Sequence, residues 1–199
     1  MAAIRTRAPV RDNSGAVDES IGVKVTDRTE DELLAGLQHV RESPREVGSL
    51  EMIVARPAVD ERSILISAEL AVDTGLVGDR WSRGSRTNPK SMLTVMNARA
   101  ADLVAGDRSR WALAGDQLFA DFDLSPANIP PGTRLAIGSA VIEVSDQPHL
   151  GCEKFAARYG KAAREFANSP EGTSLSIRGI NTRVVQSGTV RAGDAVRKV

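Results

Sequence analysis

The sequence predicts a mainly β protein, a barrel of short strands with a few peripheral α-helices. Three observations support this fold class: short stretches of high β propensity recur along the chain, glycine and aspartate separate most of them, and few segments show helical spacing. The regular strand–helix alternation that a doubly wound sheet requires is absent. The length of 199 residues suits one domain with an appended segment.

Two regions differ in texture. We expect residues 1–45 to form an N-terminal extension with a short helix, and residues 46–199 to form the barrel domain. Residues 1–20 are polar and lack apolar periodicity, which predicts a loose tail or a late-added strand. They also lack the apolar core of a secretory signal peptide, so we expect none.

The first helix is expected in TEDELLAGLQHV. Thr29 and Glu32 have the spacing of a capping box, and leucines recur behind them at helical intervals. The helix should end near Ser43 and Pro44, because proline cannot continue a helix.

Strand and turn signals follow. SLEMIVARP predicts a strand that stops at Pro57, SILISAEL predicts a second strand, and GLVGDRW predicts a glycine-rich turn. SMLTVMNARAADLVAG shows apolar residues near one helical face, which predicts a helix capped by Ser91 and ended by Gly106.

The second half begins with a strand in GDQLFADFDL. Apolar stretches on either side of Gly138 and Ser139 predict a hairpin. Residues 153–168 place aromatic and alanine residues on one stripe and predict a helix. The C-terminal GINTRVVQSGTVRAGDAVRKV predicts two or three short strands with glycine turns.

Charge and cysteine content exclude several classes of protein. The 26 basic and 26 acidic residues cancel, so no global field attracts nucleic acid or an anionic membrane. No apolar run reaches the roughly 18 residues of a membrane span. The one cysteine cannot form an internal disulfide, which fits a cytoplasmic protein. We expect no nucleic-acid or membrane partner.

That cysteine, Cys152, lies in QPHLGCEK, between a predicted strand and a predicted helix. A thiol at a helix N-terminus meets unpaired N–H groups and the positive end of the helix dipole, and both favour thiolate. A thiolate is a nucleophile, a sulfur acceptor and a soft metal ligand. The alternative is a buried thiol that packs as a small apolar group.

Several segments resemble the MOSC domain, named for the C-terminal domain of molybdenum cofactor sulfurase. They are, in the family's order, AELAVDTGLVGDRW, AGDQLFADFDL, GTRLAIGSAVIEVSDQPHLGCEKF and RGINTRVVQSGTVRAGDAV. The Gly-Asp-Arg turn and the strand-Pro-x-x-x-Cys-x-Lys segment are the most specific. Two departures are visible: Gly151 replaces the proline common before the cysteine, and Gly115-Asp116-Gln117 replaces a Gly-Glu-Asn type segment.

The resemblance implies a barrel fold that binds the molybdenum cofactor, molybdopterin, with Cys152 as sulfur carrier or as molybdenum ligand. It implies a role within a sulfurtransferase or a molybdenum-dependent oxidoreductase system. In sulfurases of the family a separate pyridoxal-phosphate domain mobilises sulfur. No pyridoxal-phosphate site is apparent in this chain, because no phosphate cup or pyridinium partner accompanies a lysine. The sulfur donor would then be another protein.

Residues suited to an anionic pterin phosphate lie at predicted strand ends and turns. Arginine side chains and backbone N–H groups recognise phosphate, and Trp81 has a flat ring that suits a pterin. Each has an alternative as a solvated surface arginine or as a packing tryptophan, and Asp79 as a turn cap. The cofactor-binding candidates are Arg56, Arg62, Arg80, Trp81, Lys154 and Arg178.

Three functions remain open. The first is a cofactor-binding, sulfur-carrying domain that uses Cys152. The second is a molybdenum-dependent reductase of N-hydroxylated compounds, which needs an electron-transfer partner because the chain has no flavin or iron–sulfur motif. The third is a non-catalytic binding barrel. The accessibility of the Cys152 thiol separates the third from the first two.

Overall fold

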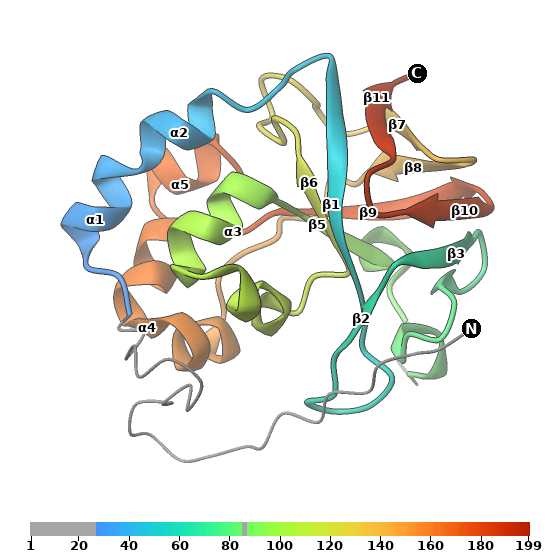
Figure 1. Cartoon of the computed structure of the whole chain (residues 1–199), viewed down its shortest axis with the longest axis horizontal. Helices are drawn as coiled ribbons and strands as arrows, with labels where there is room; N and C mark the ends of the chain where they lie inside the picture. Colours follow the sequence, from blue (N-terminus) through green and yellow to red (C-terminus); the bar gives the residue numbers. More distant parts are fainter. Residues whose placement is uncertain (1–26, 85–86) are drawn as a thin grey trace.

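The computed structural model describes residues 27–84 and 87–199, so the tail expected over residues 1–20 lies outside the described residues. Figure 1 shows the helices gathered on one side of a strand-built body. The helices are α1 (Glu30–Ala35), α2 (Leu37–Arg41), α3 (Ala98–Ala105), α4 (Glu153–Ala167) and α5 (Pro170–Ser174), with 3₁₀ segments η1 (Trp81–Arg83), η2 (Pro89–Ser91) and η3 (Arg108–Ala114). The strands are β1 (Val47–Ala55), β2 (Ser63–Leu65), β3 (Ser67–Ala71), β4 (Gly75–Leu76), β5 (Leu93–Asn97), β6 (Leu118–Asp121), β7 (Arg134–Ile137), β8 (Ala140–Val144), β9 (Ile180–Gln186), β10 (Gly188–Arg191) and β11 (Ala195–Lys198).

Seven strands close into a barrel, which confirms the predicted mainly β fold class. The order is β11-β7-β8-β9-β5-β6-β1, and a pairing of β1 with β11 closes the ring. Strand β2 extends the sheet beyond β1, and β10-β3-β4 form a small second sheet. Closure leaves the barrel strands without a free edge.

The pairing of β5 with β6 is parallel, whereas the other paired strands are antiparallel. A parallel pair needs a long crossover, and here α3 and η3 supply it. The predicted helix over 91–106 is therefore wrong in its first half: Leu93–Asn97 is strand β5, buried throughout. Asn97 caps α3 in place of Ser91, and Gly106 ends it as expected.

Three other expected elements are divided. The first helix forms with its Thr29–Glu32 capping box, but it is split at Gly36 into α1 and α2. SILISAEL forms two strands, β2 and β3, in different sheets. The expected helix over 153–168 contains a break at Gly160, whose φ is 88° and ψ is 162°. The expected hairpin around Gly138 forms as β7 and β8.

The core has two parts because strand side chains alternate in direction. On β1, Ile53 points into the barrel interior, whereas Met52 and Val54 point outward and pack with the helices. The outer cluster includes apolar residues of α1, α2, α3 and α4, so these helices cover one outer face of the barrel. No helix in the described part of the chain has the length and apolarity of a membrane span.

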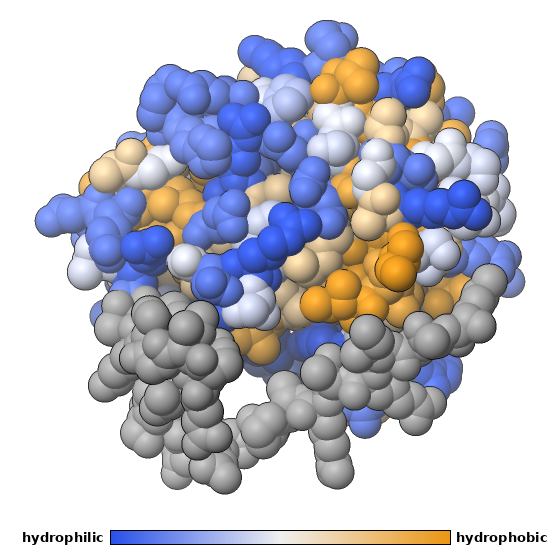
Figure 2. Space-filling view, viewed as in Figure 1, coloured by the Kyte–Doolittle hydropathy of each residue, from blue (hydrophilic) through white to orange (hydrophobic). Residues whose placement is uncertain are grey.

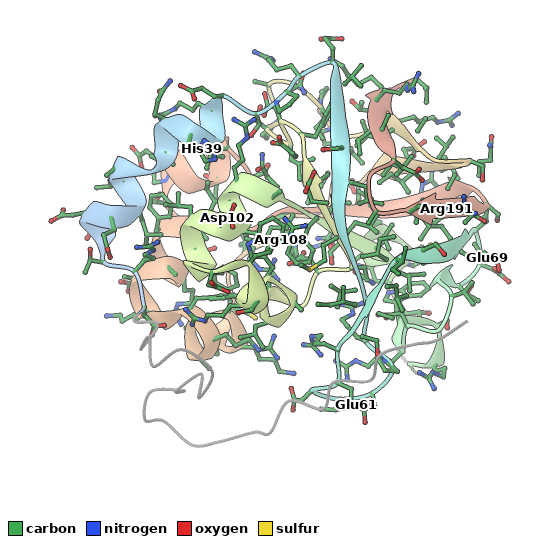
Figure 3. The ribbon with its side chains drawn as sticks, viewed as in Figure 1. His39, Glu61, Glu69, Asp102, Arg108 and Arg191 are labelled. Carbon is green, nitrogen blue, oxygen red and sulfur yellow. The ribbon has the colours of Figure 1, made fainter. Side chains whose placement is uncertain are left out.

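Segment η3 is fixed firmly against α3 and β1. Trp111 is buried and donates from its indole N–H to Asp102 of α3, over 2.8 Å. Arg108 lies over the Trp111 ring and donates to the carbonyl of Glu51. Figure 3 labels Asp102 and Arg108 where α3 and η3 face β1. The carbonyls that end η3 are thus held in place.

The face in Figure 2 is largely hydrophilic, with an apolar cluster where Figure 1 places β2 and β3. Ile64 and Ile66 in this stretch are exposed. Exposed apolar residues are common on folded proteins.

Candidate functional site

Cys152 is exposed and forms the N-cap of α4, so the thiol is accessible. Partial burial acts to raise the pKa of the thiol. The backbone N–H groups of Phe155 and Lys154 and the charge of Arg178 outweigh that effect, and the pKa lies below its ordinary value. The expected thiolate environment at a helix N-terminus is therefore present, whereas the alternative of a thiol sealed in packing does not fit its exposure.

The backbone before Cys152 is held by the far end of α4. Because the chain reverses at Gly160, Asn168 returns to the start of the helix. Its side-chain oxygen accepts from the N–H of Gly151 (2.8 Å), and its side-chain nitrogen donates to the Gly151 carbonyl (2.9 Å). Arg164 also pairs with Glu153. The turn that carries the thiol is therefore held in place by Asn168 and Arg164.

Four successive carbonyls at the end of η3 each accept a hydrogen bond from a different arginine. Arg62 donates to Ala112 (3.1 Å) and Arg158 to Leu113 (2.8 Å). Arg178 donates to Ala114 (3.1 Å) and Arg56 to Gly115 (2.7 Å). A helix C-terminus has unpaired carbonyls and partial negative charge, which guanidinium groups satisfy. We call Arg56, Arg62, Arg158 and Arg178 the arginine cluster.

Two members of the arginine cluster are already neutralised. Arg56 makes a two-point ion pair with the buried carboxylate of Asp79, which also accepts from the backbone N–H of Trp81. Arg178 pairs with the buried carboxylate of Asp116 at 2.6 Å. Burial acts to raise the pKa of Asp116, but the charge of Arg178 prevails and the pKa is lowered. These pairs anchor the site.

The other two members keep more of their charge available. Arg62 donates to the carbonyls of Ala112 and Glu61, and among the described residues it has no carboxylate within ion-pair distance. Burial, and then the charges of Arg158 and Arg56, lower the pKa of Arg62. Among the same described residues, Arg158 has an ion pair only with the exposed Asp60, at 3.4 Å. An anion would relieve this repulsion.

His149 lies beside the Asp116–Arg178 pair. Its Nδ1 is 3.7 Å from an Asp116 oxygen, too long for a hydrogen bond. Burial, and then the charge of Arg178, lower the pKa of His149 to about 4, so the ring is neutral at pH 7. The backbone of its segment is held by Asn181, which donates to the carbonyls of Gln147 and Pro148.

The structure brings Arg56, Arg62 and Arg178 together. Arg80 follows the Asp79 turn, close enough for its charge to contribute to the lowered pKa of Arg62. Trp81 is half-buried and packs against the barrel core. The side chain of Lys154 is exposed, while its backbone N–H serves the thiol.

Sequence reasoning missed Arg158 and Asn168. Arg158 lies on the first half of α4, whereas Asn168 caps the end of α4 and returns to the site because the chain turns back at Gly160. For Asn168, a glycine within a helical pattern was the available signal. It did not count His149 and Asp116 among the site residues, although both stand within quoted family segments.

Comparisons with known proteins agree with this architecture. Residues 118–197 match the family model of the MOSC domain, which confirms the resemblance seen in the sequence. No curated protein matches the sequence. Three crystal structures share the fold, at identities too low to show more than that. A hypothetical protein has 20% identity and a TM-score of 0.55, covering 81% of this chain and 70% of its own. YiiM from Escherichia coli has 21% identity and a TM-score of 0.51, and the match covers 76% of this chain and 69% of that protein. YiiM from Geobacillus stearothermophilus has 15% identity and a TM-score of 0.50, and the match covers 79% of this chain and 74% of that protein.

Proposed function

We propose a function on the premise that this chain carries a MOSC domain: it binds the molybdenum cofactor and uses Cys152 as a sulfur-carrying thiol. MOSC domains are linked to this cofactor in general. The observation that carries the proposal is the exposed Cys152 thiol, whose pKa is lowered in part by the charge of Arg178, a member of the arginine cluster. A thiol buried in apolar packing, or acidic side chains around the thiol, would have argued against the proposal.

The residues present fit an anionic pterin phosphate. Within the described part of the chain, neither the Arg62 nor the Arg158 guanidinium is neutralised by a buried carboxylate, and Arg80 lies near Arg62. Arg56 and Arg178, whose charges are balanced by the buried carboxylates of Asp79 and Asp116, hold the framework instead. Arg158 follows Cys152 by six residues on α4, a rise of roughly 9 Å. Phosphate at Arg62 and Arg158 would leave the rest of an extended ligand within reach of the thiol.

The chemistry of the chain itself lies in the thiol. Its thiolate attacks the outer sulfur of a persulfide on a donor protein. The new bond joins the Cys152 sulfur to that outer sulfur, the donor's S–S bond breaks, and the donor leaves as a thiolate. The N–H groups at the start of α4 favour the attacking anion and require no added base. The same soft sulfur suits molybdenum as a ligand. When bound, the cofactor would supply the redox chemistry of molybdenum.

The test uses the full chain, expressed with molybdate. Fluorescence of the oxidised pterin and metal analysis report cofactor, and mass spectrometry after incubation with a persulfide donor reports transferred sulfur. We expect both signals in the wild type, loss of transferred sulfur in Cys152→Ser, and weakened pterin retention in Arg62→Ala. Ser174→Ala, an exposed change on α5, is the control. Wild-type protein that retains no pterin and accepts no sulfur would reject the proposal.

A further inference from the structure

A half-open cavity of about 260 Å³ lies between the turn that follows β6 and helix α5. The segment after β8 and the residues that lead into β9 complete its walls. The walls are largely apolar, and their apolar side chains include Leu124, Ile129, Val144, Leu150 and Ile180.

The cavity is lined by the segment that leads to Cys152. Leu150 and His149, which line it, precede Cys152 by two and three residues. Arg178, which also lines it, is close enough for its charge to help lower the pKa of the Cys152 thiol. A molecule in this cavity would therefore contact the segment that leads to Cys152 and the arginine whose charge acts on the thiol.

The charged groups in the cavity wall are compensated. Arg178 pairs with the buried carboxylate of Asp116, and Asp146 pairs with Lys90 at 2.9 Å. His149 has a pKa of about 4 and is uncharged at pH 7. A charged ligand would lose its hydration here without gaining a free counter-charge, which is costly. The cavity thus favours an uncharged occupant.

Two wall residues have unsatisfied polar atoms. Arg178 Nε and His149 Nδ1 are buried and lack hydrogen-bond partners, as does the Asp116 oxygen that lies 3.7 Å from His149 Nδ1. Among the described residues only one further buried side-chain atom, Arg28 Nε, shares this condition. Buried polar groups are normally paired. The Arg178 Nε–H can only donate, so its missing partner is an acceptor.

We propose that this cavity binds a small uncharged molecule with an apolar body and a carbonyl-type acceptor, placed against Arg178 and the segment that precedes Cys152. A cavity of about 150 Å³ holds benzene, so this one suits a body of one or two rings. The acceptor pairs with Arg178 Nε–H after a small side-chain adjustment. That the occupant is the substrate of the site rests on the proposed function; the binding itself does not.

The experiment is an NMR titration of the cofactor-free chain with three probes of similar size and shape: benzamide, benzoate and benzylammonium. We expect saturable shifts of the Leu150 and Ile180 amides with benzamide, and binding weaker by about tenfold or more for the two ions. Thr173→Trp, an exposed wall position on α5, should abolish the benzamide shifts, whereas the neighbouring Ser174→Trp, which is outside the wall, should retain them.

Equal binding of the three probes, no benzamide binding, or identical behaviour of the two tryptophan variants would overturn the proposal. Sulfur transfer to Cys152, measured on the same preparation, distinguishes failure of the cavity proposal from failure of the proposed thiol function. If sulfur transfer succeeds and benzamide fails to bind, only the cavity proposal falls. If benzamide binds and the thiol accepts no sulfur, only the thiol chemistry falls.

Discussion

The side-chain amide of Asn168 makes two hydrogen bonds to the backbone of Gly151, one through each of its polar atoms. The two residues are 17 positions apart and meet because α4 reverses at Gly160. This contact fixes the residue that directly precedes Cys152. It couples the end of the folded-back helix to the geometry of the thiol.

Asn168→Ala should raise the pKa of the Cys152 thiol, because the loosened turn no longer holds the thiolate against the N–H groups of α4. Loss of two hydrogen bonds should also lower the free energy of unfolding by about 2 kcal/mol. The pH dependence of alkylation gives the first quantity and urea unfolding the second. Lys161→Ala, an exposed change on the same helix, is the control. Lower stability with an unchanged alkylation profile would mean that Asn168 supports the fold but not the thiol.

Gly151→Pro, which introduces the proline that the MOSC family commonly has before its cysteine, should destabilise this chain. Proline has no N–H to donate to the Asn168 oxygen, so about 1 kcal/mol should be lost. In the Asn168→Ala background the same change should cost less, and a double-mutant cycle by urea unfolding measures this coupling. Additive losses would show that the hydrogen bond is not what the proline disrupts.

Local patterns in the sequence were sufficient for elements whose determinants are adjacent in the chain. The Thr29–Glu32 box, the Gly138 hairpin and the Gly106 helix end all depend on neighbours. Strand β5 did not follow from local pattern, because it is buried on both faces and its apolar run fits helix and strand equally. Only its pairing with β6 and β9 decides the matter.

The candidate site shows the same limit. Arg56 and Arg178 could be chosen as basic residues near strand ends, but the sequence does not say that each has a buried aspartate partner. Those partners are 23 and 62 residues away. Sequence could therefore propose cations for the site and could not separate structural arginines from those free to bind a ligand.

Mutation of Arg56 and mutation of Arg62 should have different effects: the first should mainly lower stability and the second should mainly lower affinity for the pterin phosphate. Arg56→Ala leaves the carboxylate of Asp79 buried and unpaired, which should lower the free energy of unfolding by about 3 kcal/mol or more. Arg62→Ala removes no partner of a buried carboxylate, so its loss of stability should be smaller, while affinity for the pterin phosphate should fall by about tenfold. Urea unfolding and a pterin-fluorescence titration measure the two effects. Arg134→Ala, an exposed change on β7, is the control. A reversed order of stability losses would contradict this division of roles.

The free energy of unfolding should depend on pH through His149. Its pKa is about 4 in the folded chain, against an ordinary value near 6.5, so the unfolded chain binds the proton more readily. This contribution is complete above about pH 6.5 and is lost as the pH falls toward 4, by at most about 3 kcal/mol. The pKa of Asp116 in the folded chain is lowered below its ordinary value of 3.8, so Asp116 affects the free energy of unfolding at more acidic pH. Urea unfolding at several pH values should therefore show that the free energy of unfolding falls between about pH 6.5 and pH 4. His149→Gln should remove this fall, and the exposed change His39→Gln should leave it intact. A decline that survives in His149→Gln would assign it to other groups.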